Sequence, residues 1–168
     1  MAEKEDWPPL LRPGEHVLCL EELFILCVQF FALSKERNSI FAGFGKIVQE
    51  LDRLDIPADL IIDGSFLTEE IDPDDIDFAV VVSQEYFDSC YGESLTYLQW
   101  IRDDRTIKST HRCDCNLCVE FKADHPLYFD GIQNRAFWVD FFAKSIIYKR
   151  DRGVVVMSPE QYGTPWMR

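Results

Sequence analysis

The fold is decided by Leu60-Ile61-Ile62-Asp63-Gly64-Ser65 and, after a nine-residue acidic loop, by Asp75-Ile76-Asp77-Phe78-Ala79-Val80-Val81-Val82. Apolar, β-branched runs of this length, bounded by a glycine turn and a polar loop, are typical of buried strands. Because side chains alternate between the two faces of a strand, the even-numbered residues from Ile76 to Val82 would share one face and fill a core. The sequence therefore predicts two buried strands, at 60–62 and 76–82.

The rest of the chain supplies helices and two more strands. Helices are predicted over 20–33, 39–54, 84–103 with a break at Gly92, and 133–145, and strands over 113–121 and 154–156. Asn38 is the predicted N-cap of the second helix, and Phe137, Trp138 and Phe141 are predicted to face inward from the last helix. This order of elements predicts an α/β (α+β) architecture, with helices flanking a small mixed sheet.

The whole chain, 1–168, is expected to form one domain preceded by an extended arm. Residues 1–17 hold Pro8, Pro9, Pro13 and Gly14, which favour an arm without regular structure. The first residues are acidic and lack the features of a signal peptide, and no apolar run is long enough to span a membrane. These features predict a cytoplasmic protein with no membrane contact.

Charge limits the partners that the chain can have. Thirty acidic residues against 17 basic ones give a net charge of −13. This charge opposes nonspecific nucleic-acid binding, which depends on Lys and Arg at phosphates. A nucleic-acid end could still enter a local basic patch or approach a bound metal ion. Solubility is the simplest reading of the acidity, and a basic protein partner is the alternative.

Carboxylates mark the candidate site. Asp75 and Asp77 project from the same strand face, where they would repel each other unless a cation lies between them. Carboxylate oxygens suit Mg²⁺ or Mn²⁺. Gly64 allows close approach of backbone to a ligand, and the Ser65 hydroxyl can add a donor to a phosphate. The alternative is that Asp75 and Asp77 are solvated turn residues at the start of the strand.

A third carboxylate is predicted from the strand at 113–121. Polar and apolar residues alternate along this strand, and Asp114 begins the polar face. It would join Asp75 and Asp77 if this strand pairs with theirs. Glu120 and Asp124 are alternative third ligands on sequence grounds. The three predicted metal ligands are therefore Asp75, Asp77 and Asp114.

The six cysteines raise a zinc alternative that the spacing does not favour. His111, Cys113, Cys115 and Cys118 crowd together. However, Cys118 would face away from the other two thiols on a strand, so one strand cannot gather all three around an ion. Buried free thiols are the preferred interpretation.

The combination of Gly64-Ser65, about ten further residues, and Asp75-Ile76-Asp77 before an apolar run resembles the signature of the DNA polymerase β-type nucleotidyltransferase superfamily. A longer resemblance links the chain to an uncharacterised family of small bacterial and phage nucleotidyltransferase-like proteins. It rests on Pro8-Pro9-Leu10-Leu11-Arg12-Pro13-Gly14-Glu15-His16, Leu20-Glu21-Glu22, His125-Pro126, Phe137-Trp138 and Gly153-Val154-Val155-Val156.

The resemblance implies a metal-dependent transfer of a nucleoside monophosphate from a nucleoside triphosphate to a hydroxyl on an RNA end, a protein or a small molecule. Asp75, Asp77 and Asp114 would hold two metal ions, and Ser65 would help to orient the triphosphate. The acidic loop between Ser65 and Asp75 is a departure from what the resemblance implies, because its negative charge would repel a triphosphate. Candidates for phosphate or acceptor contacts are Lys108, Arg112, Lys144, Lys149, Arg150 and Arg152. The alternative is a non-catalytic interaction protein of this fold in a toxin–antitoxin or phage-defence system.

Overall fold

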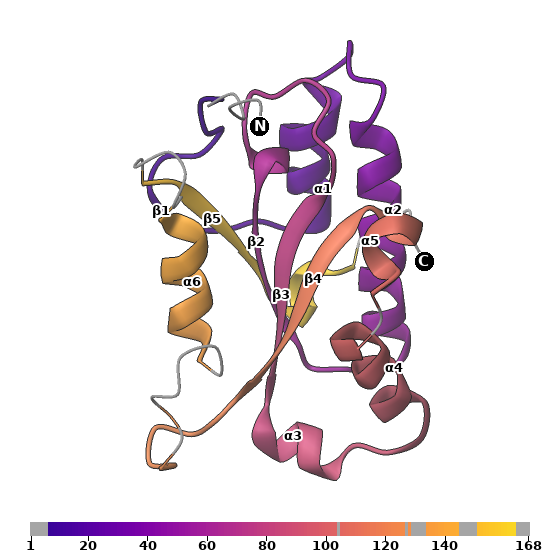
Figure 1. The fold of residues 1–168 in the computed structure, drawn as a ribbon, viewed down its shortest axis with the longest axis vertical. Coiled ribbons are helices and arrows are strands. Elements are labelled where there is room, and N and C mark those ends of the chain that lie inside the picture. Colours follow the sequence, from indigo (N-terminus) through magenta and orange to yellow (C-terminus); the bar gives the residue numbers. More distant parts are fainter. Residues whose placement is uncertain (1–6, 104, 127, 129–133, 145–150, 164–168) are drawn as a thin grey trace.

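A five-stranded mixed sheet forms the centre of the molecule (Figure 1). The computed structural model describes residues 7–163 apart from 104, 127, 129–133 and 145–150. The strands, in spatial order, are β1 (Gly14–Val17), β5 (Gly153–Met157), β2 (Asp59–Asp63), β3 (Ile76–Ser83) and β4 (Cys113–Glu120). β1–β5 and β3–β4 are parallel pairs, whereas β2 is antiparallel to both β5 and β3. The predicted α/β class with a mixed sheet is confirmed.

Helices cover both faces of this sheet (Figure 1). One face packs against α1 (Leu20–Phe24), the π-helix that continues it (Ile25–Gln29), α2 (Arg37–Arg53), α4 (Gly92–Asp103) and α5 (Ile107–His111). The other face packs against α6 (Arg135–Ala143). Short helices α3 (Gln84–Ser89), Ser65–Leu67 and Pro159–Gln161 complete the described elements. The even-numbered residues from Ile76 to Val82 fill the larger core, as the alternation predicts.

Several predicted boundaries were wrong, each for a physical reason that the structure shows. Residues 14–17 form β1, because they pair with β5 from the far end of the sequence. α2 begins at Arg37 rather than beyond Asn38, since the Ser34 hydroxyl already accepts the amide of Arg37 at 3.0 Å. Phe141 is 44% exposed, whereas Trp138 and Phe142, one turn apart, face the core. Residues 133 and 145 of the predicted last helix lie outside the described residues.

A buried arginine holds the acidic loop between Ser65 and Asp75 against the helices. The Arg37 side chain is fully buried and donates to backbone carbonyls of Cys27 at 2.8 Å, Phe66 at 2.7 Å and Thr68 at 2.7 Å. Further donations reach the carbonyls of Glu70 and Ile71. The guanidinium carbon also lies 3.7 Å from the centre of the Phe31 ring. Most of this loop lies outside helices and strands, so its buried carbonyls need other hydrogen-bond donors, and the Arg37 side chain supplies them.

We expect Arg37→Met to lower the free energy of unfolding by about 3–5 kcal/mol, because several buried carbonyls lose a charged donor. Urea denaturation followed by circular dichroism measures the change. Arg53→Met is the matched control, because Arg53 makes exposed ion pairs with Glu50 and Glu93, so its loss should cost far less than the loss of Arg37. Equal losses in the two variants would contradict this role of Arg37.

Candidate metal centre

Three carboxylates converge where β3 begins. In the sheet, Asp77 of β3 pairs with Asp63 of β2 on one side and with Asp114 of β4 on the other. Paired residues of neighbouring strands project from the same face, so this register places their side chains in one row. Asp75 precedes β3 by one residue. Ligand atoms of Asp75, Asp77 and Asp114 lie within 4.8 Å of one another, and this triad can hold a metal ion.

Gly64 makes room for the central carboxylate. Its backbone has φ 90° and ψ −172°, a conformation that is essentially restricted to glycine. A Cβ at this position would lie only 1.9 Å from Asp77 Oδ2. Ser65 follows directly and begins the short helix Ser65–Leu67, which places Gly64-Ser65 on the β2 side of the triad. The predicted Gly-Ser bend therefore packs against the predicted metal ligand.

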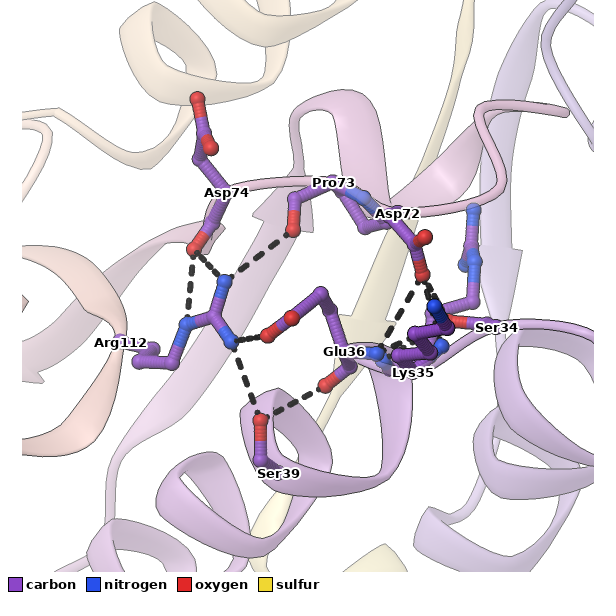
Figure 2. A network of polar contacts seen from close by, with 9 residues as sticks. Ser34, Lys35, Glu36, Ser39, Asp72, Pro73, Asp74 and Arg112 are labelled. Carbon is purple, nitrogen blue, oxygen red and sulfur yellow. Dashed lines mark hydrogen bonds and ion pairs between the residues drawn. The ribbon is translucent and has the colours of Figure 1, made fainter.

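The acidic loop presents one of its carboxylates to α2 (Figure 2). Asp72 Oδ1 accepts the Ser34 hydroxyl at 2.9 Å and the backbone amides of Lys35 at 2.8 Å and Glu36 at 3.3 Å. These donors, led by the Lys35 amide, hold the pKa of Asp72 below its usual value. The Asp72 carboxylate thus caps backbone amides directly before α2 instead of facing the triad.

Arg112 fixes the backbone next to Asp75. Its guanidinium donates through Nε at 3.0 Å and Nη2 at 2.9 Å to the carbonyl of Asp74, and it pairs with Glu36 at the start of α2 (Figure 2). Its own carbonyl accepts the amide of Ile76 at 3.1 Å. Arg112 was a candidate for phosphate contact, but the structure uses it to clamp the chain on both sides of Asp75.

Burial and mutual repulsion perturb the row of carboxylates. Burial, together with the negative charges of Asp75, Asp114 and Asp63, raises the pKa of Asp77 to about 7. Burial is the largest of these causes. Burial likewise raises the pKa of Asp63 to about 6, against the Gly64 amide and the Arg152 charge, which lower it. Negative charge in this row is therefore costly unless a cation balances it.

Lys108 from α5 supplies a cation at this site. Its ammonium Nζ lies 2.6 Å from Asp75 Oδ2 and 2.8 Å from Asp114 Oδ2. Contacts with these two carboxylates, the hydrogen bond to Asp114 first, raise the pKa of Lys108. Asp75 makes an ion pair with Lys108, and its buried Oδ2 accepts no hydrogen bond from the described residues, so this oxygen keeps unused acceptor capacity. A hard cation would use the same oxygens, so the donor set suits Mg²⁺ or Mn²⁺.

Asp63 was not predicted for this site from the sequence, and Lys108 was predicted only as one of six candidates for phosphate or acceptor contacts. Asp63 is only 7% exposed, and its Oδ1 has no hydrogen-bond partner among the described residues. The signal that could have found Asp63 is its place directly before Gly64 at the end of a buried strand. Lys108 was one of several surface cations, and nothing in its local sequence distinguishes it from the others.

The remaining sequence candidates add no ligand to the triad among the described residues. Cys113 and Cys118 are buried in the two different cores, as the strand alternation predicts, and burial raises the pKa of the Cys118 thiol to about 12. Among the described residues, no group of His and Cys converges with metal-ligand spacing. Lys144, directly after α6, forms an isolated antiparallel β-bridge with Asp151 through the backbone, and Arg152 is buried. Lys149 and Arg150 lie outside the described residues.

The perturbed carboxylates make stability depend on pH. A carboxyl whose folded pKa is raised stabilises the fold below its ordinary pKa and loses that contribution as pH rises through the folded value. For Asp77 this window runs from about pH 4 to about pH 7. We expect metal-free protein to lose about 3 kcal/mol of unfolding free energy between pH 5 and pH 8. Urea denaturation in a chelator at both pH values tests this; an increase in stability over that window would contradict it.

No helix among the described residues combines the length and apolarity needed to cross a membrane. Comparison with curated proteins and with solved structures returned no significant match. A protein-family model described as a family of unknown function, DUF6932, matches residues 4–158. This match spans the sheet, the triad and the helices on both faces. The chain therefore belongs to the DUF6932 family of proteins of unknown function.

Proposed function

We propose that this protein is a metal-dependent nucleotidyltransferase, which transfers a nucleoside monophosphate from a nucleoside triphosphate to a hydroxyl acceptor. The observation that carries the proposal is the convergence of Asp75, Asp77 and Asp114 within 4.8 Å, with Gly64 packed against Asp77. Carboxylate clusters with open positions for water and phosphate oxygens suit Mg²⁺ in nucleotide sites. The resemblance of Gly64-Ser65 and Asp75-Ile76-Asp77 to the superfamily signature supports the same reaction.

The chain's own residues would act mainly by positioning. A bound Mg²⁺ or Mn²⁺ would neutralise phosphate charge and lower the pKa of the acceptor hydroxyl. Gly64 and Ser65 would present backbone amides and a hydroxyl to the triphosphate on the β2 side. Arg112 and Arg37 would hold the loop so that Asp75 stays beside Asp77. Accurate placement of the reacting groups is the main protein contribution in phosphoryl transfer.

A second function is favoured by the Lys108 contacts. Because its ammonium already balances Asp75 and Asp114, the cluster can persist without a metal ion. A non-catalytic protein of this fold, binding a basic partner through its net charge of −13 in a toxin–antitoxin or phage-defence system, is consistent with that balance. Such a protein would show neither metal-dependent nucleotide binding nor transfer.

A thermal shift experiment separates the two functions. Wild type is heated with Mg²⁺ and each nucleoside triphosphate in turn, beside Asp75→Asn/Asp77→Asn. The control, Asp52→Asn/Asp88→Asn, removes the same charge from exposed positions. We expect at least one triphosphate to raise the melting temperature of wild type and control but not of the site variant, because ligands stabilise the state that binds them.

Transfer is then followed with the active triphosphate labelled on the α- or the γ-phosphate, in the presence of total RNA and of the protein itself. The proposal expects label in the acceptor from the α-position alone and release of pyrophosphate. Absence of any nucleotide-induced shift, or equal labelling by wild type and Asp75→Asn/Asp77→Asn, would rule out this function for the site.

A further inference from the structure

A basic pocket adjoins the triad on the side away from Gly64-Ser65. It has a volume of about 410 Å³ and lies between the end of α4, α5 and the beginning of β4. Both helices pack next to β4 (Figure 1). Its polar lining comes from Arg102, Arg105, Lys108, Asp114 and Asn116. This volume falls within the usual range for small-ligand sites. Asp114 and Lys108 belong to both the pocket and the triad.

Three cations line this pocket in a chain whose net charge is −13. Arg102 is ion-paired with the neighbouring Asp103, and the Nε–Oδ1 distance is 2.8 Å. Both of those side chains are more than half exposed, so the pair is open to exchange with another anion. Arg105 lies in the turn that follows, and its side chain is exposed. Lys108 completes the group from α5 through its contacts with Asp75 and Asp114.

The order of strands indicates which substrate of the proposed reaction would lie next to this pocket. Gly64-Ser65 follows β2, the triad lies on β3 and β4, and β4 is the edge strand of the sheet. In an in-line displacement the attacking hydroxyl and the leaving pyrophosphate lie on opposite sides of the α-phosphorus. If the triphosphate lies along Gly64-Ser65, the acceptor must approach from the β4 side, where the basic pocket lies.

Building on the proposed function, we propose that the Arg102–Arg105–Lys108 pocket binds the acceptor, and that this acceptor is a hydroxyl compound carrying phosphate. Guanidinium groups bind phosphate through paired hydrogen bonds, and an ammonium binds it as a point charge. The sources of this chemistry are the 3′ end of a polynucleotide and a phosphorylated small molecule. Proteins without phosphate would not match the lining.

The reaction balances with these two substrates alone. The acceptor oxygen forms a bond to the α-phosphorus, and the bond from that phosphorus to the bridging oxygen breaks. Pyrophosphate leaves with the electron pair of the broken bond, and the hydroxyl proton passes to solvent. Arg102 and Arg105 act only on the acceptor's phosphate, so they are specificity-determining residues and take no part in the bond changes.

Binding of the acceptor can be measured without turnover and without the nucleoside triphosphate. A short fluorescently labelled oligoribonucleotide with a free 3′ hydroxyl is titrated at low salt with Mg²⁺, and anisotropy gives the dissociation constant. A nucleoside monophosphate is added as a competitor in a second arm. The variant is Arg102→Gln/Arg105→Gln; the control is Lys46→Gln/Arg53→Gln, which removes two exposed cations from α2.

We expect the pocket variant to bind the oligonucleotide about tenfold or more weakly than wild type and control. Its plot of log affinity against log salt should be shallower by about 1.4, since each lost phosphate contact on a single strand removes about 0.7. Displacement of the oligonucleotide by the monophosphate at low excess would identify a phosphorylated small molecule as the acceptor. Displacement only at very large excess would identify a polynucleotide end.

Three results would overturn the inference. They are no measurable binding of either probe to wild type, equal binding by the pocket variant and the control, and loss of the triphosphate-induced thermal shift in Arg102→Gln/Arg105→Gln. The last of these would assign the pocket to the triphosphate instead. Failure of the proposed function is a separate result, because it removes the triphosphate shift from wild type while leaving oligonucleotide binding to be measured.

Discussion

Replacing Gly64 by alanine is expected to lower the free energy of unfolding by about 4 kcal/mol or more and to abolish divalent-cation binding. The added Cβ would meet Asp77 Oδ2 at 1.9 Å, and the backbone at φ 90° and ψ −172° is strained for any residue with a side chain. Either the loop or the carboxylate must move, and the triad loses its geometry in both cases. Urea denaturation and Mn²⁺ titration measure the two effects.

Two further variants separate strain from collision. Gly14 also has a positive φ, 125°, but a Cβ there meets no atom within 4 Å, so Gly14→Ala should cost only the backbone strain of about 1–2 kcal/mol. Asp77→Ala removes the colliding carboxyl, so Gly64→Ala should cost about 2 kcal/mol less in the Asp77→Ala background than in wild type. Equal costs of Gly64→Ala in the two backgrounds would show that Gly64 and Asp77 do not interact.

Asp77→Asn is expected to stabilise the metal-free protein while abolishing its response to Mg²⁺ or Mn²⁺. Asparagine keeps the shape of the side chain but removes a buried charge that is repelled by Asp75, Asp114 and Asp63. We expect a gain of about 2–3 kcal/mol at pH 8, with the difference from wild type vanishing below about pH 4, where the carboxyl becomes protonated in the unfolded state as well as the folded one. Denaturation at both pH values, with chelator, measures the gain.

Asp75→Asn is the control for the stability gain expected of Asp77→Asn. Its carboxylate is paired with Lys108 at 2.6 Å, so Asp75→Asn removes a metal ligand and also an ion pair. It should lose the metal response as Asp77→Asn does, but it should not gain stability. If the two variants gain equally, general relief of the chain's negative charge explains the result, and the specific repulsion at Asp77 does not.

The core and part of the triad follow from local sequence. Ile76, Phe78 and their even-numbered neighbours alternate strictly, and this period alone determines the face that they share in β3. Asp75 and Asp77 are two residues apart, so strand geometry brings them together without further information. Asp114 required one additional assumption, that its strand pairs with β3, and the observed register satisfies that assumption.

The parts that sequence reasoning missed depend on contacts between distant segments. β1 has no apolar alternation, and it becomes a strand because β5 offers it an edge. Lys108 enters the site because α5 packs next to the start of β4. Arg37 is buried by carbonyls that come from both sides of it in the sequence. Local propensity carries no information about such tertiary partners.

Anomalous diffraction from a crystal soaked in Mn²⁺ tests the central claim most directly, because it locates the ion itself. The expected result is an anomalous peak bounded by carboxylate oxygens of Asp75, Asp77 and Asp114, with Lys108 Nζ displaced from its present contacts of 2.6 Å and 2.8 Å. A map with no peak between these carboxylates, and with the Lys108 ammonium still bridging Asp75 and Asp114, would contradict the account.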